Sequence, residues 1–260
     1  VGVFLHLYYD DLAASFAERL RQIDAPLRLY VSTDTEAKAA RIAPHLPQAE
    51  IRVLPNRGRD IWAKLYGFAD VYDRHDIVLH LHGKKSQHSH KLDAWLAHIL
   101  DCLLGPREEV NRILSIFQAI PSLGLITPLA YRSVLAAAHW GANRDIAREL
   151  AHRMGLPGAL PDHAGLQFPI GSMFWGRVKA IRPLLDLRLT LDHFPPEAGQ
   201  VDGTLAHAIE RMLGVTCRAQ GFSILPVCGP NQNFHGAFRH SFTSNRDLRA
   251  ALDAQEFAPR

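Results

Sequence analysis

The 260 residues fit one large domain, and 47% hydrophobic with 21% charged residues are typical of a globular protein rather than a disordered or collagen-like chain. Lys and Arg total 29 against 26 Asp and Glu, so the chain lacks the one-sided excess of a surface that binds nucleic acid. Three cysteines without a CxxC pair exclude a disulfide framework and a zinc finger. The chain has no apolar run of about 20 residues, which excludes a membrane-spanning helix.

In chain order, the apolar spacing predicts alternating strands and helices. The strands are expected at 3–8, 27–32, 49–55, 76–82, 123–127, 167–174 and within 216–224. The helices are expected at 11–23, 35–43, 61–72, 91–104, 106–120, 144–154, 179–184 and 203–213. This alternation is typical of an α/β fold with a mixed, mostly parallel sheet and helices on both faces. Ligands of such sheets bind beyond the carboxyl ends of strands, so the polar clusters that follow strands are the candidate site.

A dense polar turn at residues 56–60 follows the third predicted strand. Arg57 and Arg59 flank Gly58, and arginine offers planar, bidentate donors to phosphate or carboxylate. Asp60 is placed to cap the next helix. The turn therefore indicates anion binding, although a surface turn with two solvated arginines fits the same residues.

A histidine pair ends the fourth predicted strand. His80 and His82 are two residues apart and so point to the same face of a strand. Such a pair can ligate a metal, but Lys84 and Lys85 follow directly and favour a phosphate instead. Structural histidines remain an alternative.

Two later segments carry side chains suited to a sugar site. Gly171 and Ser172 interrupt an apolar run that leads to Trp175, whose ring could stack on a sugar or belong to the core. Asp202 lies at the expected start of a helix, where a carboxylate in a cleft can act as a general base or merely cap the helix. A further polar run with a histidine, residues 231–236, follows the last strand.

The motifs PNRGRDI, LHLHGKKS, GSMFWGR and DGTLAHAIERMLG, in this order, resemble the rhamnan synthesis protein F family from about residue 1 to about residue 236. These are bacterial proteins of rhamnose-rich polysaccharide and O-antigen assembly, regarded as glycosyltransferases. The resemblance implies one GT-A-like, Rossmann-like domain. Its halves are a nucleotide-sugar-binding part at about 1–128 and an acceptor and catalytic part at about 129–240, with a tail at 241–260.

The resemblance also implies an inverting transfer of rhamnose from a dTDP-linked donor, with Asp202 as the first choice of base and Glu197 as the second. The donor nucleotide and diphosphate are then expected to contact Tyr8, Thr33, Arg57, Arg59, Asp60, His80, His82, Lys84 and Lys85. The sugar and acceptor are expected to contact Ser172, Trp175, Gln200, His207, Asn233 and His235.

GT-A enzymes usually carry an Asp-x-Asp motif and a divalent metal where this chain has His80-Leu81-His82. We therefore expect no metal and no other cofactor, with lysines and arginines neutralising the diphosphate. A soft-metal set of His80, His82 and His235 is the opposing reading.

The expected partners are dTDP-rhamnose, a glycan or lipid-linked glycan acceptor, and other domains of a larger assembly protein, but not nucleic acid. The chain starts at Val1 without Met, and we expect an excised or processed domain in the cytoplasm that can lie at the inner face of the membrane. The alternatives are a metal-dependent phosphohydrolase or nucleotidyltransferase that uses the histidine pair, and a non-catalytic glycan-binding module.

Overall fold

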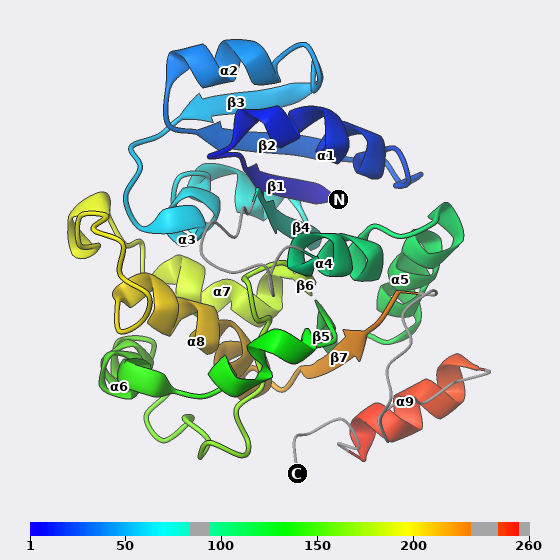
Figure 1. The fold of residues 1–260 in the computed structure, drawn as a ribbon. Coiled ribbons are helices and arrows are strands. Elements are labelled where there is room, and N and C mark those ends of the chain that lie inside the picture. Colours follow the sequence, from blue (N-terminus) through cyan, green and yellow to red (C-terminus); the bar gives the residue numbers. More distant parts are fainter. Residues whose placement is uncertain (84–93, 230–243, 255–260) are drawn as a thin grey trace.

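The computed structural model describes residues 1–83, 94–229 and 244–254. Seven strands form one sheet in the order β3-β2-β1-β4-β6-β5-β7 (Figure 1). Neighbours pair in parallel, except that β6 is antiparallel to both β4 and β5. The strands are β1 Gly2–His6, β2 Arg28–Thr33, β3 Ala49–Val53, β4 Ile77–His82, β5 Leu123–Pro128, β6 Phe174–Arg177 and β7 Ser223–Val227. The predicted mixed, mostly parallel sheet is confirmed.

Helices cover both faces of this sheet. They are α1 Ala13–Leu20, α2 Glu36–Ile42, α3 Arg59–Leu65, α4 Trp95–Leu103, α5 Arg107–Ala119, α6 Arg144–Arg153, α7 Val178–Asp186, α8 Leu205–Ala219 and α9 Asn245–Asp253. Short 3-10 turns lie at Asp10–Leu12, Ala69–Arg74, Arg132–Ala137, Gly141–Asn143 and Leu191–His193. No helix of the described ranges is both long enough and apolar enough to cross a membrane.

Two hydrophobic cores lie on the two faces because successive strand residues point in opposite directions. In β1, Val3 and Leu5 join the core that contains residues of α1, α2, α4, α5 and α9. Phe4, between them, joins the core that contains residues of α3, α6, α7 and α8. Every residue of β1 is buried, as expected for a central strand of a sheet covered on both sides.

Two predicted strand positions were wrong. The strand expected at 167–174 begins only at Phe174, because Gly171 and Ser172 have φ angles of +90° and +52° that break an extended backbone. The strand expected within 216–224 begins at Ser223, since α8 continues through a β-branched run to Ala219. Helix α9 lies within the segment 241–260, for which the sequence analysis named a tail and no helix.

The chain order of the strands reverses beside β1. The chain runs outward from β1 to β2 and β3, and then returns to place β4 on the other side of β1. His6 of β1 and His82 of β4 are register partners, so the carboxyl ends of these two strands lie next to each other. Ligands of open α/β sheets bind at such a reversal, beyond the carboxyl ends of the strands.

Candidate functional site

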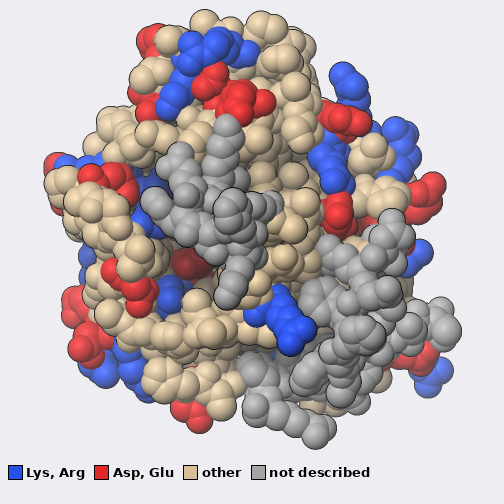
Figure 2. Space-filling model, in the orientation of Figure 1, with Lys and Arg blue, Asp and Glu red and all other residues tan. Residues whose placement is uncertain are grey.

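The reversal between β1 and β4 adjoins α3 and α8, and the surface there is hollowed. Figure 2 shows a hollow near these helices, with an acidic side chain at its floor and basic side chains beside it. Two polar clusters from distant parts of the chain meet in this region. The first is centred on Asp60 of α3 and the second on Asp202, which precedes α8.

Asp60 is the centre of the first cluster and does not cap α3, because the residue at the cap position is Gly58. One carboxylate oxygen lies 2.8 Å from the Lys64 ammonium and accepts a hydrogen bond from the Ser172 hydroxyl. The other lies 3.6 Å from Nδ1 of His82. Burial alone would raise the pKa of Asp60, but His82, Lys64 and Ser172 hold it well below the ordinary value. Asp60 is therefore a carboxylate at neutral pH.

Lys64 is a site residue that the sequence analysis missed. Its side chain is 1% exposed, and its ammonium donates to the Ser172 carbonyl at 2.8 Å as well as to Asp60. The spacing of four residues between Asp60 and Lys64 is that of an ion pair on a helix, which is the one signal that could have found it. A buried lysine held by two partners fixes α3 against the turn at 171–172.

That turn is held by two further contacts. Nε2 of His82 bonds the Gly171 carbonyl at 2.9 Å, and the Gly171 amide donates to Glu210 at 2.7 Å. Ser172 has a left-handed backbone, which a non-glycine residue adopts only when its surroundings determine it. Strained turns of this kind are concentrated at functional sites. Ser172 is 3% exposed and its hydroxyl donates to Asp60, so its predicted contact with a sugar stays a prediction.

Three predicted ligand contacts lie in the interior and are corrected here. His80 is 1% exposed and bonds the Tyr72 hydroxyl through Nε2 at 2.9 Å. Trp175 is fully buried, and its indole donates to the Leu103 carbonyl at 2.9 Å. Thr33 is fully buried, and its hydroxyl donates to a backbone carbonyl of the neighbouring chain segment. The sheet is covered on both faces, so strand residues of either orientation meet a core instead of a ligand.

The histidine pair is consequently split between two roles. The His80 ring is stacked on Phe174 with centroids 4.6 Å apart, whereas His82 lies at the edge of the site against Asp60. The two rings are not arranged to hold one ion. Within the described residues, no three His, Cys, Asp or Glu side chains form a group that could hold a metal.

Tyr8 follows β1 and remains partly exposed at the reversal. The Lys38 ammonium lies 3.9 Å from its ring centroid, and the same ammonium pairs with Asp34 at 2.6 Å. Stacking of Tyr8 on a base stays a prediction. Lys84, Lys85, Asn233 and His235 lie outside the described residues.

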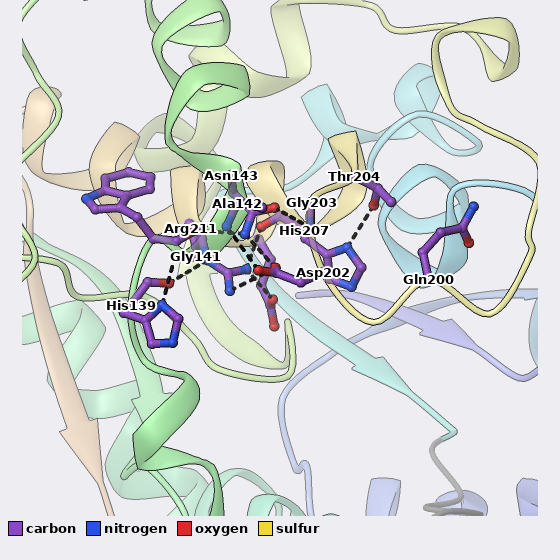
Figure 3. Close-up of polar contacts among 12 residues, drawn as sticks. His139, Gly141, Ala142, Asn143, Gln200, Asp202, Gly203, Thr204, His207 and Arg211 are labelled. Carbon is purple, nitrogen blue, oxygen red and sulfur yellow. Dashed lines mark hydrogen bonds and ion pairs between the residues drawn. The ribbon is translucent and has the colours of Figure 1, made fainter.

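Asp202 is the centre of the second cluster (Figure 3). One oxygen accepts from the Asn143 amide at 2.6 Å, and the other accepts from the Ala142 backbone N–H at 3.1 Å. The Arg211 guanidinium lies 3.5 Å away. The side chain is still 35% exposed. Helix α8 begins at Leu205, so Asp202 binds the loop before α6 and does not cap α8.

These contacts determine the charge of Asp202. Partial burial alone would raise its pKa, but the hydrogen bonds from Asn143 and Ala142, with the charge of Arg211, lower it below the ordinary value. Asp202 is therefore ionised at neutral pH, and its oxygens keep lone pairs for one more donor. An exposed, ionised and rigidly held carboxylate can accept a proton from a bound hydroxyl group.

His207 lies in the first turn of α8, shortly after Asp202. It is 9% exposed and bonds the Thr204 hydroxyl through Nδ1 at 2.8 Å. Burial, followed by the charge of Arg59, lowers the pKa of His207 to about 4, and both Asp202 and Asp60 act on it in the opposite direction. The ring is thus neutral at pH 7. The two clusters are joined by other contacts: Glu210, which accepts from the Gly171 amide, lies 3.5 Å from the Arg211 guanidinium, and that guanidinium lies 3.5 Å from Asp202.

The turn that contains Arg57 and Arg59 is hydrogen-bonded to the segment that contains Glu197. Arg57 donates to the Phe194 carbonyl, and Arg59 donates to the Gln200 carbonyl. One oxygen of Glu197 accepts the backbone N–H of Gly58 and Arg59 at 3.1 Å each. This binding to the start of α3 disfavours Glu197 as a base. The Gln200 side chain bonds within its own loop, and contacts of the arginines with phosphate stay predictions.

Comparison with known proteins identifies the family. The model of the family described as Rhamnan synthesis protein F matches residues 1–222. The chain belongs to this family. Two proteins named "Uncharacterized protein WxcX", from Xanthomonas campestris pv. campestris strains B100 and ATCC 33913, are each 37% identical over 231 residues, which cover 86% of this chain and 32% of theirs. The chain thus spans about a third of the length of these curated relatives.

One solved structure is also similar to this member of the rhamnan synthesis protein F family. It is CMP:2-keto-3-deoxy-manno-octonic acid synthetase in complex with CTP, with 13% identity and a TM-score of 0.42 over 98% of each chain. That likeness is too remote to bear on function. Family membership places the chain among proteins of polysaccharide synthesis.

Proposed function

We propose that this chain is a GT-A-like glycosyltransferase domain that transfers a deoxysugar, rhamnose, from a nucleotide-sugar donor to a growing bacterial polysaccharide. The observation that carries the proposal is Asp202. It is an ionised, partly exposed carboxylate fixed by Asn143 at a site formed where the strand order reverses. Membership of the rhamnan synthesis protein F family supports rhamnose as the sugar.

The donor is assigned to the carboxyl ends of β1 and β4. Tyr8 is the partner for the nucleoside base, and His82 lies at the end of β4 beside Asp60. Lys84 and Lys85 follow in sequence and, with Arg57 and Arg59, are our candidates for neutralising the diphosphate as it leaves. This charge would replace a divalent metal.

In the proposed reaction, the acceptor hydroxyl oxygen attacks the anomeric carbon from the face opposite the diphosphate. Its proton passes to Asp202 as the new C–O bond forms. The bond from the anomeric carbon to the diphosphate breaks, and the nucleoside diphosphate leaves with the electron pair. A single displacement of this kind inverts the anomeric centre. The neutral His207 is suited to orient a sugar hydroxyl and carries no charge that would repel a cation-like transition state.

The acceptor, the location of the reaction and the partner domains belong to the same proposal. The acceptor is a glycan or a lipid-linked glycan, and the reaction takes place in the cytoplasm at the inner face of the membrane. Because the chain spans about a third of its curated relatives, the other domains of a longer protein are the natural partners. The alternative of a phosphohydrolase or nucleotidyltransferase that uses the histidine pair loses its basis, since His80 is bonded to Tyr72 in the core.

A binding screen tests the proposal. The purified chain is heated with dTDP-L-rhamnose, dTDP-glucose, a GDP-sugar or a UDP-sugar, each with and without EDTA. A donor at 100 times its Kd stabilises the folded state by about 2.7 kcal/mol, which raises the Tm of a chain of this size by about 5–10 °C. We expect this rise with dTDP-L-rhamnose, unchanged by EDTA.

Two results would overturn parts of the proposal. No shift with any nucleotide sugar, together with binding of a rhamnose-containing glycan, would identify a non-catalytic glycan-binding module. A shift that EDTA abolishes would show that a metal does hold the diphosphate.

A further inference from the structure

The segment at 192–202, which we call the strap, lies between α7 and α8 and ends at Asp202. It lies across the start of α3, and it is joined there to the turn Arg57-Gly58-Arg59. Arg57 donates through Nε to the Phe194 carbonyl at 2.5 Å, and its backbone forms a β-bridge with Pro196. The turn and the strap are about 140 residues apart in sequence, so these contacts are purely tertiary.

Glu197 is the strongest point of this junction. One carboxylate oxygen accepts two backbone N–H groups, those of Gly58 and Arg59, at 3.1 Å each. The other oxygen lies 3.8 Å from the Arg59 guanidinium, which also donates to the Gln200 carbonyl. Hydrogen bonds with an ionised acceptor are about twice as strong as neutral ones. The strap is therefore anchored by charge-assisted contacts at Glu197, which lies five residues before Asp202.

The backbone of the turn is shaped for this contact. Gly58 has φ +76°, and a Cβ at this position would lie 2.8 Å from the Phe194 ring of the strap. Arg59 has φ +54°, an uncommon value for a residue with a side chain. Such conformations persist only where the surroundings determine them. Here they aim two backbone N–H groups at one carboxylate.

Between Gln200, whose carbonyl accepts a hydrogen bond from Arg59, and Asp202 the strap has only Val201. Val201 is 91% exposed, whereas Asp202 itself is bonded to Asn143 and Ala142 on the other side. The base is thus held from two directions, by the loop before α6 and by the strap. Loss of the strap anchor would leave only one of them.

We propose that Glu197 and the Arg57-Gly58-Arg59 turn form a latch that positions Asp202 for proton transfer. Glu197 is then a positioning residue and does not itself take the proton. The kinetic part of this inference rests on the proposed glycosyltransferase function, while the structural part does not. Two variants test this contact of one acceptor with two N–H donors. Glu197→Ala removes the acceptor, and Glu197→Gln keeps a carbonyl oxygen in its place.

The structural part is tested by hydrogen exchange on the whole chain without substrate. We expect the amides of 197–203, which follow two prolines, to exchange faster in Glu197→Ala, with exchange close to wild type in Glu197→Gln. Asp73→Ala removes an exposed carboxylate that pairs with Arg182, and it serves as the matched control with no effect on the strap. Unchanged exchange at 197–203 in Glu197→Ala would refute the latch whether or not the chain transfers sugar.

The positioning part is tested by steady-state kinetics with dTDP-L-rhamnose. We expect Glu197→Ala to lower kcat by tenfold or more with an unchanged donor KM, because a misplacement of about 1 Å can cost about 10²-fold. Glu197→Gln should recover most of this loss. Faster exchange with wild-type kcat would refute positioning. A wild-type chain that transfers no sugar would refute the proposed function, and the exchange experiment would still decide the latch.

Discussion

The buried pair of Asp60 and Lys64 makes a sharp prediction about stability. The Lys64 side chain is 1% exposed and the Asp60 side chain 11%, and their charged atoms are 2.8 Å apart. Lys64→Met keeps the length and apolar stem of the side chain but removes its charge. Asp60 then remains as a buried carboxylate with Ser172 and the more distant His82 as partners. The perturbation therefore leaves one charge without its closest counterion.

Removing one member of a buried ion pair costs about 3–5 kcal/mol, whereas replacing both by neutral groups of similar volume is often close to neutral. For a chain of this size, each kcal/mol corresponds to about 2–4 °C in Tm. We expect Lys64→Met to lower the Tm by about 6–20 °C. The double variant Asp60→Asn with Lys64→Met should recover at least half of that loss, because Asn can still accept the Ser172 hydroxyl.

The assays are thermal unfolding, which gives the Tm, and urea unfolding, which gives the free energy, both followed by circular dichroism. Both single variants, the double variant and wild type form one cycle. Arg182→Met, which breaks an exposed pair with Asp73, is the matched control and should cost less than about 1 kcal/mol. If Lys64→Met were as stable as wild type, or if the double variant were less stable than both single variants, the reasoning about the buried pair would be wrong.

Three further predictions concern pH, backbone and core. Burial lowers the pKa of His6 and of His207 from 6.5 to about 4, so between these values the unfolded chain binds protons that the folded chain does not. The free energy of unfolding should therefore fall as the pH drops from 6.5 to 4, and His207→Gln should flatten that slope. Gly155→Ala should destabilise the chain by about 1–2 kcal/mol, because Gly155 has a positive φ but open space for a Cβ. Gly58→Ala should cost more, because its Cβ would also meet the Phe194 ring. Equal losses in urea unfolding would show that this contact with Phe194 is unimportant. Trp175→Phe should cost about 1–3 kcal/mol through the lost bond to the Leu103 carbonyl, yet leave the donor Kd unchanged in calorimetry; a weaker donor would restore Trp175 to the binding site.

The sheet could be predicted from sequence because its signals are local. Short apolar runs separated by helical spacing identify strands, and polar turns that follow them identify the binding edge. The predicted strand boundaries were wrong where local signals conflicted. At Gly171 and Ser172, for example, an apolar run that predicts a strand has a left-handed backbone. The antiparallel pairing of β6 has no signal in the chain itself, since pairing is a property of the assembled sheet.

The site was less predictable because its contacts join distant segments. Lys64 reaches Ser172 across 108 positions, and Asp202 reaches Asn143 across 59. The type of a side chain shows whether it is polar, but it does not show whether helices cover the strand face on which it lies. His80 and Trp175 were therefore assigned to ligands, although both lie in the core. The chain has 15 histidines, and among the described residues His6, His80, His98 and His207 are buried, which gives these four a structural role.

The central claim is that Asp202 takes the proton from the acceptor. It is tested most directly by the rate of sugar transfer from dTDP-L-rhamnose in Asp202→Asn, measured with the donor Kd of the same variant and with Asp73→Asn as the matched surface control. Loss of a positioned general base lowers the rate by about 10²–10⁴-fold. We predict a loss of this size with an unchanged donor Kd. Transfer at the wild-type rate by Asp202→Asn would contradict the account.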